Sequence, residues 1–136
     1  MSWSTWDVNG YGISDEDMQI SYNEEDVDKL LKKAPVAYKT IKKQMKDDGI
    51  DLYEDYENDD GEYGIMPVIT AAIREIEKIS LEYHQAENGN FILFPPFYPW
   101  NACLEHDRDM TTDKLDIIYR KYFGTNGDYV SAQYQG

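Results

Sequence analysis

Several features that mark common protein classes are scarce or missing in this sequence. There is one cysteine among 136 residues, so no disulfide can form within the chain and nothing indicates an oxidising compartment. No apolar run approaches the roughly 18 residues that a membrane span needs. The N-terminus has neither the basic nor the apolar region of a signal peptide. These absences predict a cytoplasmic protein that binds no membrane.

Basic residues are also scarce, and they are unevenly placed. The chain has 27 Asp and Glu residues against 13 Lys and Arg, which gives a net charge of −14. Residues 1–28 hold eight acids and no base, residues 29–46 hold seven lysines and no acid, and residues 47–62 hold nine acids and no base. An excess of this size disfavours direct binding to nucleic acid, which is itself a polyanion. The excess favours a basic protein partner, a bound cation or simple solubility.

What the sequence does contain is enough apolar material for a folded core. Hydrophobic residues make up 41% of the chain and aromatic residues 14%, which argues against intrinsic disorder in spite of the high net charge. A length of 136 residues is also typical of a single domain. We therefore predict a single domain that spans residues 1–136.

Apolar periodicity predicts about four helices. The clearest pattern is an apolar stripe along residues 67–85, which we expect to form the central core helix. A pair of helices over residues 24–48 is divided at Pro35, because proline fits the first turn of a helix but not its interior. A last helix is capped at its start by Thr111 or Thr112.

About three strands complete the predicted elements. Residues 3–8 are rich in β-prone side chains and precede an Asn9-Gly10 turn signal, and further strands are expected at residues 91–94 and 129–134. The order of elements predicts an α+β fold, with the helices packed on a small and mainly antiparallel sheet. A predominantly helical domain is the alternative.

Residues 47–62, with the sequence DDGIDLYEDYENDDGE, are called the acid-rich stretch below. A charge run is ordinarily a solvated face or loop. Here two tyrosines are interleaved with the acids, and spaced carboxylates on a surface can imitate the phosphates of a duplex and occupy a basic groove. The residues expected to contact such a partner are Asp51, Tyr53, Glu54, Asp55, Tyr56, Glu57, Asp59, Asp60 and Glu62.

An aromatic, proline-rich segment follows the predicted strand at residues 91–94. Its prolines prevent a regular ladder strand, so we expect an extended loop. Phe97, Tyr98 and Trp100 either cover the sheet or form a second contact surface, since tyrosine and tryptophan are favoured interface anchors.

Metal and catalytic motifs were sought and match poorly. A calcium-binding loop with Gly61 at its sixth position places Tyr56 and Pro67 where ligands belong. Cys103 and His106 lack the paired-cysteine spacing of a zinc site, even with a neighbouring carboxylate such as Asp107 as a further ligand. The sequence therefore predicts no catalytic residue, no metal ligand and no cofactor, and a divalent-metal-binding or hydrolytic domain ranks third among the functions considered.

Three segments give the chain a resemblance in type to a known group of proteins. They are the opening Ser2-Trp3-Ser4 with the Asn9–Gly12 sequence NGYG, the FPPFYPW sequence at 94–100, and the YVSAQY sequence at 129–134. With its small size, lone cysteine and acidity, the chain resembles the accessory proteins of prophages and mobile elements of Gram-positive bacteria. That group includes anti-CRISPR and other anti-defence inhibitors, several of which are DNA mimics, and the resemblance implies an inhibitor.

The expected function is that of an acidic, non-enzymatic protein that engages a basic protein surface and occupies its nucleic-acid-binding site. The alternative is a structural or assembly module of a phage or mobile element, which binds its partner through the Phe91–Trp100 aromatic loop. In that case the negative charge serves solubility.

Overall fold

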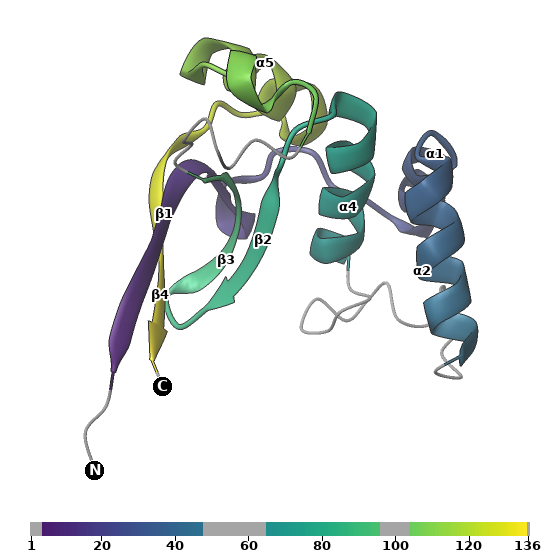
Figure 1. Cartoon of the computed structure of the whole chain (residues 1–136), viewed down its shortest axis with the longest axis horizontal. Helices are drawn as coiled ribbons and strands as arrows, with labels where there is room; N and C mark the ends of the chain where they lie inside the picture. The colour runs from purple at the N-terminus through teal and green to yellow at the C-terminus, as the bar shows by residue number, and fades with distance from the viewer. Residues whose placement is uncertain (1–3, 48–64, 96–103, 136) are drawn as a thin grey trace. The chain divides into compact units, whose positions relative to one another are not determined.

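The sheet is built on one long strand, β1 (Thr5–Ser14), which changes its neighbours along its length (Figure 1). The computed structural model describes residues 4–47, 65–95 and 104–135. Its four described strands are antiparallel and lie in the order β2-β3-β1-β4. The other three strands are β2 (Glu82–Ala86), β3 (Gly89–Phe94) and β4 (Asp128–Gln135).

The chain divides into two compact units. The sheet unit comprises Met1–Ser21 and Ser80–Gly136, and the helical unit comprises Tyr22–Ile79. With four helices and four strands among the described residues, the α+β class is confirmed. The sheet has one strand more than the sequence predicted. The single-domain organisation stays a prediction.

Two glycines allow β1 to pass close to β3. A Cβ atom on Gly12 would collide with the carbonyl oxygen of Ile92 and would lie 2.6 Å from the Cα atom of Leu93. A Cβ atom on Gly10 would lie 2.6 Å from the carbonyl oxygen of Phe94. The turn predicted at Asn9-Gly10 is therefore wrong: the strand continues, because residues without side chains permit a close approach of the neighbouring backbone.

The sheet also curls so that its two edge strands are tied together. The side-chain amide of Asn88, in the β2–β3 turn, donates to the carbonyl of Ser131 at 2.8 Å and accepts from the backbone N–H of Gln133 at 2.9 Å. The N–H of Glu87 donates to the carbonyl of Gln133 at 2.9 Å. The outer edge of β4 is thus occupied over this part of the strand, which protects it from pairing with another chain.

The inside of the curl holds a small apolar core. Phe91 and Leu93 of β3 pack with Ala132 of β4, and the partly buried side chains around them come from β1, β2 and β4. Trp6 stacks on Tyr134 with ring centroids 5.6 Å apart. These contacts join strands that are distant in the sequence.

Helix α5 (Thr112–Phe123) belongs to the sheet unit and follows the predicted boundaries closely. The hydroxyl of Thr111 accepts from the N–H of Lys114, and Gly124 ends the helix with φ of 74°, a conformation that glycine adopts readily. The hydroxyl of buried Tyr119 donates to the carbonyl of Tyr11 at 2.6 Å, so α5 is bonded to β1.

Three described helices form the helical unit: α1 (Glu24–Lys32), α2 (Pro35–Asp47) and α4 (Ile65–Glu77). Asn23 caps α1 in a capping box with Asp26, and Pro35 begins α2 as predicted.

The predicted helix over residues 67–85 is wrong over its last eight residues, 78–85. Helix α4 ends at Glu77, Lys78 has a left-handed backbone with φ of 57°, and the chain then enters β2. The apolar stripe of α4 extends to Ile79 by helical spacing, but the ladder with β3 decides the conformation of the residues that follow. Asn88-Gly89 is typical of a hairpin turn, and the chain does turn here between β2 and β3; the strand that such a turn requires before it was not predicted.

Candidate functional site: an apolar cavity and the anchors of the acid-rich stretch

The contact residues predicted from the sequence lie outside the described part of the chain. Asp51–Glu62 fall within residues 48–64, and Phe97, Tyr98 and Trp100 fall within residues 96–103, together with Cys103. The structure describes the elements at the two ends of each segment. It also describes a cavity that the sequence did not reveal.

Both ends of the acid-rich stretch join helices that are bonded to each other. Helix α2 ends at Asp47 and α4 begins at Ile65. The carboxylate of Glu75 on α4 accepts from the N–H of Ala37 at 2.7 Å and from that of Val36 at 3.2 Å, in the first turn of α2. A carboxylate is favoured there because it satisfies free N–H groups and complements the helix dipole.

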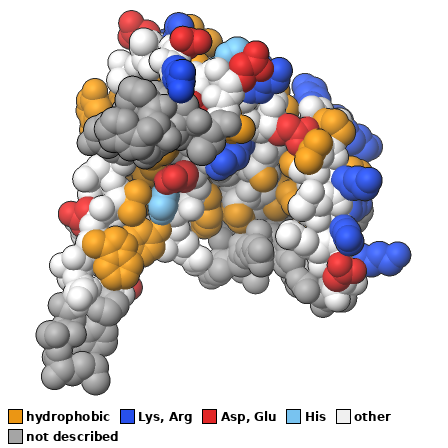
Figure 2. Space-filling model, viewed as in Figure 1, with side chains coloured by type: hydrophobic (Ala, Val, Ile, Leu, Met, Phe, Trp, Pro, Cys, Tyr) orange, Lys and Arg blue, Asp and Glu red, His pale blue; other side chains and the backbone are white. Residues whose placement is uncertain are grey.

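The two lysines of α1 are paired with acids of the same helix, and three of the four lysines of α2 are exposed. Lys29 lies 3.3 Å from Glu25 and Lys32 lies 3.1 Å from Asp28, both one helical turn apart. Lys and Arg side chains gather over α1 and α2 in Figure 2. Within the described residues, four exposed lysines form no ion pair: Lys33, Lys39, Lys43 and Lys46.

Charge is distributed unequally between the units. The sheet unit carries twelve Asp and Glu residues against four Lys and Arg. The described residues of the helical unit carry seven acids against nine bases. The negative charge of this protein therefore resides in the sheet unit and in residues 48–64.

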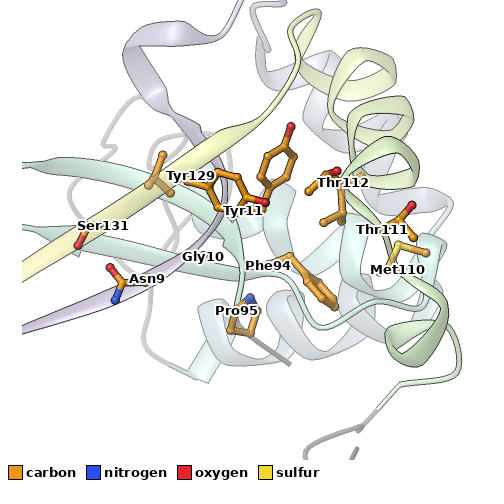
Figure 3. Close-up of a pocket in the computed structure, with 12 residues that line it drawn as sticks. Asn9, Gly10, Tyr11, Phe94, Pro95, Met110, Thr111, Thr112, Tyr129 and Ser131 are labelled. Carbon is orange, nitrogen blue, oxygen red and sulfur yellow. The ribbon is translucent and has the colours of Figure 1, made fainter. Parts of the chain in front are cut away.

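The sheet unit contains a cavity of about 530 Å³ beside the start of α5 (Figure 3). Its lining comes from Asn9–Tyr11 of β1, Tyr129–Ser131 of β4, Phe94 with Pro95, and Met110 with the first residues of α5. The volume is within the range of about 300–1,000 Å³ that is usual for ligand pockets. The lining is mostly apolar, and the described lining residues carry no charge.

A hydrogen-bond network fixes the tyrosine wall of this cavity. The hydroxyl of Tyr11 donates to Oδ1 of Asp116 at 2.8 Å, and the N–H of Gly127 donates to the same oxygen at 2.9 Å. The ring of Tyr11 meets that of Tyr129 edge-on, with centroids 5.2 Å apart, and lies 6.2 Å from the ring of Tyr119. Asp116 thus places both the ring of Tyr11 and the chain that leads into β4.

The network makes a testable prediction about the ionisation of Tyr11. Burial, followed by the hydrogen bond to Asp116 and the charge of that carboxylate, raises the pKa of Tyr11 from 10.0 to about 12. The neutral phenol therefore stabilises the fold fully below about pH 10, and this contribution is lost as the pH rises toward about 12.

The ¹³Cζ resonance of Tyr11 in protein with labelled tyrosine measures this pKa directly. We expect it to lie well above the ordinary value in the wild type. In Asp116→Asn it is expected to fall part of the way back, because the charge is removed while the burial remains. A wild-type Tyr11 that titrates near the ordinary value of about 10 would contradict the network.

The cavity is suited to binding an apolar group rather than to proton transfer. Its polar lining groups are the amide of Asn9 and the hydroxyls of Thr111, Thr112 and Ser131. Tyr129 stands at its edge with 78% of its surface exposed, and tyrosine is a residue type that is enriched in protein interfaces. The cavity is not predictable from the sequence because its walls come from four separate segments, of which only Phe94-Pro95 lies in a predicted contact region.

A second polar cluster ties β2 to β4. The ring nitrogens of His84 lie 2.6 Å from the hydroxyl of Tyr134 and 2.9 Å from a carboxylate oxygen of Glu82. Burial, and then the charge of Glu82, raise the pKa of Tyr134 above its ordinary value, which opposes formation of a phenolate. We interpret the cluster as a structural link between the two edge strands.

The carboxylate of Asp107, considered above as a metal ligand, is already hydrogen-bonded to other residues of the chain. Its carboxylate accepts from the N–H and hydroxyl of Ser80 and from the N–H of Leu104. In the described ranges, no three His, Cys, Asp or Glu side chains come together in a way that could hold a metal ion. Among the helices of these same ranges, none has both the length and the apolar character to cross a membrane.

Comparisons with other proteins add no relative to this description. The chain matches no protein-family model, no curated protein sequence and no solved structure.

Proposed function

We propose that this chain is a non-enzymatic binding protein that engages a basic protein surface through its acid-rich stretch. By presenting spaced carboxylates, it would occupy the groove in which the partner binds nucleic acid. The contacts fall to the acids and the two tyrosines of Asp51–Glu62. Attraction of this kind acts mainly on the rate and orientation of association.

The observation that carries this proposal is the way in which both ends of the acid-rich stretch are held. The chain leaves from α2 and returns to α4, and Glu75 bonds these two helices. Because α2 and α4 belong to one compact unit, the stretch is attached at both ends, and it has fewer conformations to lose on a partner than a free tail would have. The exposed lysines of α2 repel a basic partner and so limit the surfaces by which it can approach.

Charge reversal within the stretch tests the proposal. In the variant Asp55→Lys, Glu57→Lys, Asp59→Lys and Asp60→Lys, we expect capture of the partner from host lysate to fall at least about tenfold, while the thermal melt stays near that of the wild type. Capture by the wild type is expected to weaken between about 50 mM and 500 mM salt, because salt screens exposed charges. Quantitative mass spectrometry of the eluted proteins measures both effects.

A matched variant carries the same change of net charge on exposed acids of the sheet unit. It replaces Asp7, Glu16, Asp17 and Glu87 by lysine. If the acid-rich stretch is the contact, this variant retains capture within about threefold. Equal losses in the two variants would mean that net charge alone governs binding, and the assignment to the stretch would be wrong.

A second candidate function is an assembly module that binds through the Phe91–Trp100 loop. It is favoured by the position of Phe94, the last residue of β3, and Pro95, which belong to this segment and line the cavity. In that case Tyr98→Ala and Trp100→Ala disrupt capture, and salt has little influence, because apolar contacts are screened weakly. The same capture assay separates the two functions.

A further inference from the structure

We propose that the cavity of the sheet unit is the anchor site for an apolar, preferably aromatic, side chain on a basic segment of the partner. This inference rests on the proposed function and adds the chemistry of the partner: one large apolar residue flanked by lysines or arginines. It assigns a role to a surface formed by the start of α5 and by β4.

The shape and lining of the cavity favour a side chain over a small molecule. Pockets for small molecules enclose most of the ligand and aim a few buried polar groups at it. Here the polar lining groups belong to the exposed residues Asn9, Thr111 and Thr112 and to the partly buried Ser131, while Tyr129 stands exposed at the edge. An aromatic edge beside an apolar depression is typical of the sites where protein partners insert their anchors.

The backbone of β4 restricts how a partner can dock. Asn88 and Glu87 already occupy the outward hydrogen-bonding groups of Ser131 and Gln133. A partner strand therefore cannot extend the sheet along this part of β4 without displacing them. Insertion of a side chain into the cavity needs no free strand edge.

Charge around the lining selects a basic segment. Three exposed acids are direct chain neighbours of lining residues: Asp109 precedes Met110, Asp113 follows Thr112, and Asp128 precedes Tyr129. One exposed base, Lys114, is also present, and its ammonium group donates to the carbonyl oxygen of Asp109 at 3.0 Å. The acids outnumber this base, so they attract cationic residues on either side of the anchor.

Synthetic peptides test the inference on the full-length chain. The probe has one tryptophan between lysines and arginines, and the comparison peptides replace the tryptophan by alanine or the basic residues by glutamate. Amide resonances of Tyr11, Leu115 and Val130 report on the cavity. We expect saturable shifts with the probe, at least about tenfold weaker binding of the alanine peptide and at least about threefold weaker binding of the acidic one.

A variant that fills the cavity provides the decisive comparison. Thr112→Phe adds an aromatic ring at an exposed lining position and is expected to weaken binding of the probe peptide about tenfold. Thr40→Phe adds the same ring at an exposed position of α2 and is expected to leave binding unchanged. Thermal melts of both variants confirm that they are folded.

The outcomes separate this inference from the proposed function. Equal binding of the tryptophan and alanine peptides, or shifts that fall outside the cavity, would overturn the inference even if charge reversal of the acid-rich stretch abolishes capture. Probe binding that is lost in Thr112→Phe supports it. If capture survives charge reversal while the probe still binds the cavity, the proposed function fails and the cavity remains a binding site.

Discussion

Replacing Gly12 by valine is expected to destabilise the sheet unit by about 3 kcal/mol or more. The new Cβ atom would meet the carbonyl oxygen of Ile92, the carbonyl carbon of Ile92 at 2.8 Å and the Cα atom of Leu93 at 2.6 Å. All three are backbone atoms, so no change of rotamer can make room. The strands β1 and β3 must move apart, which breaks the ladder between Tyr11–Ser14 and Phe91–Phe94.

Tryptophan fluorescence during urea denaturation measures this effect, because Trp6 of β1 stacks on Tyr134 within the sheet unit. Asn9→Ala is the matched control, since Asn9 is exposed on the same strand, and its free energy of unfolding is expected to stay within about 0.5 kcal/mol of the wild type. If Gly12→Val unfolds at the same urea concentration as the wild type, the close approach of β1 to β3 at Gly12 is wrong.

Replacing Asp107 by alanine is expected to cost about 3 kcal/mol. Asp107 is 1% exposed, and its carboxylate accepts from the N–H of Ser80 at 2.7 Å, from the hydroxyl of Ser80 at 2.5 Å and from the N–H of Leu104 at 3.1 Å. Hydrogen bonds to a charged group are stronger than neutral ones, and their loss leaves donors without a partner. The chain that enters β2 then loses its link to the segment before α5.

Two further substitutions are compared with Asp107→Ala. Asp107→Asn keeps one carbonyl oxygen as an acceptor and is expected to lose about half as much stability as the alanine variant. Asp109→Ala changes an exposed acid in the same short helix, η3 (Asp107–Asp109), and is expected to change the free energy of unfolding by at most about 0.5 kcal/mol. Similar losses in the free energy of unfolding for Asp107→Ala and Asp109→Ala would contradict the stabilising role of the buried Asp107 carboxylate.

The sequence predicted the elements whose signals are local. Pro35 and Thr111 mark helix starts through backbone geometry and capping, and in the structure α2 begins at Pro35 and Thr111 caps α5. Features that depend on distant partners were missed. Strand β2 continues an apolar helical pattern, and Gly10 and Gly12 are typical of a turn until β3 is known to pass beside them.

The candidate site was predictable only in part, because it too depends on residues that are distant in the sequence. Composition identifies a charge excess, but it cannot distinguish a solvated acid from one that the fold uses, as Asp107 and Glu75 illustrate. The cavity is assembled from segments more than one hundred residues apart, such as Asn9–Tyr11 and Tyr129–Ser131, which become neighbours only through the β1–β4 pairing. Its acidic surroundings agree with the preference for a basic partner inferred from net charge.

Competition with nucleic acid is the most direct test of the central claim. The captured partner is loaded with a fluorescent DNA duplex, and the full-length chain is titrated in at low salt while fluorescence anisotropy is recorded. We predict that the chain displaces the duplex, that the variant reversed at Asp55, Glu57, Asp59 and Asp60 does not, and that the matched sheet-unit variant does. A complex in which the partner holds the chain and the duplex together would contradict the claim that this protein occupies a nucleic-acid-binding site.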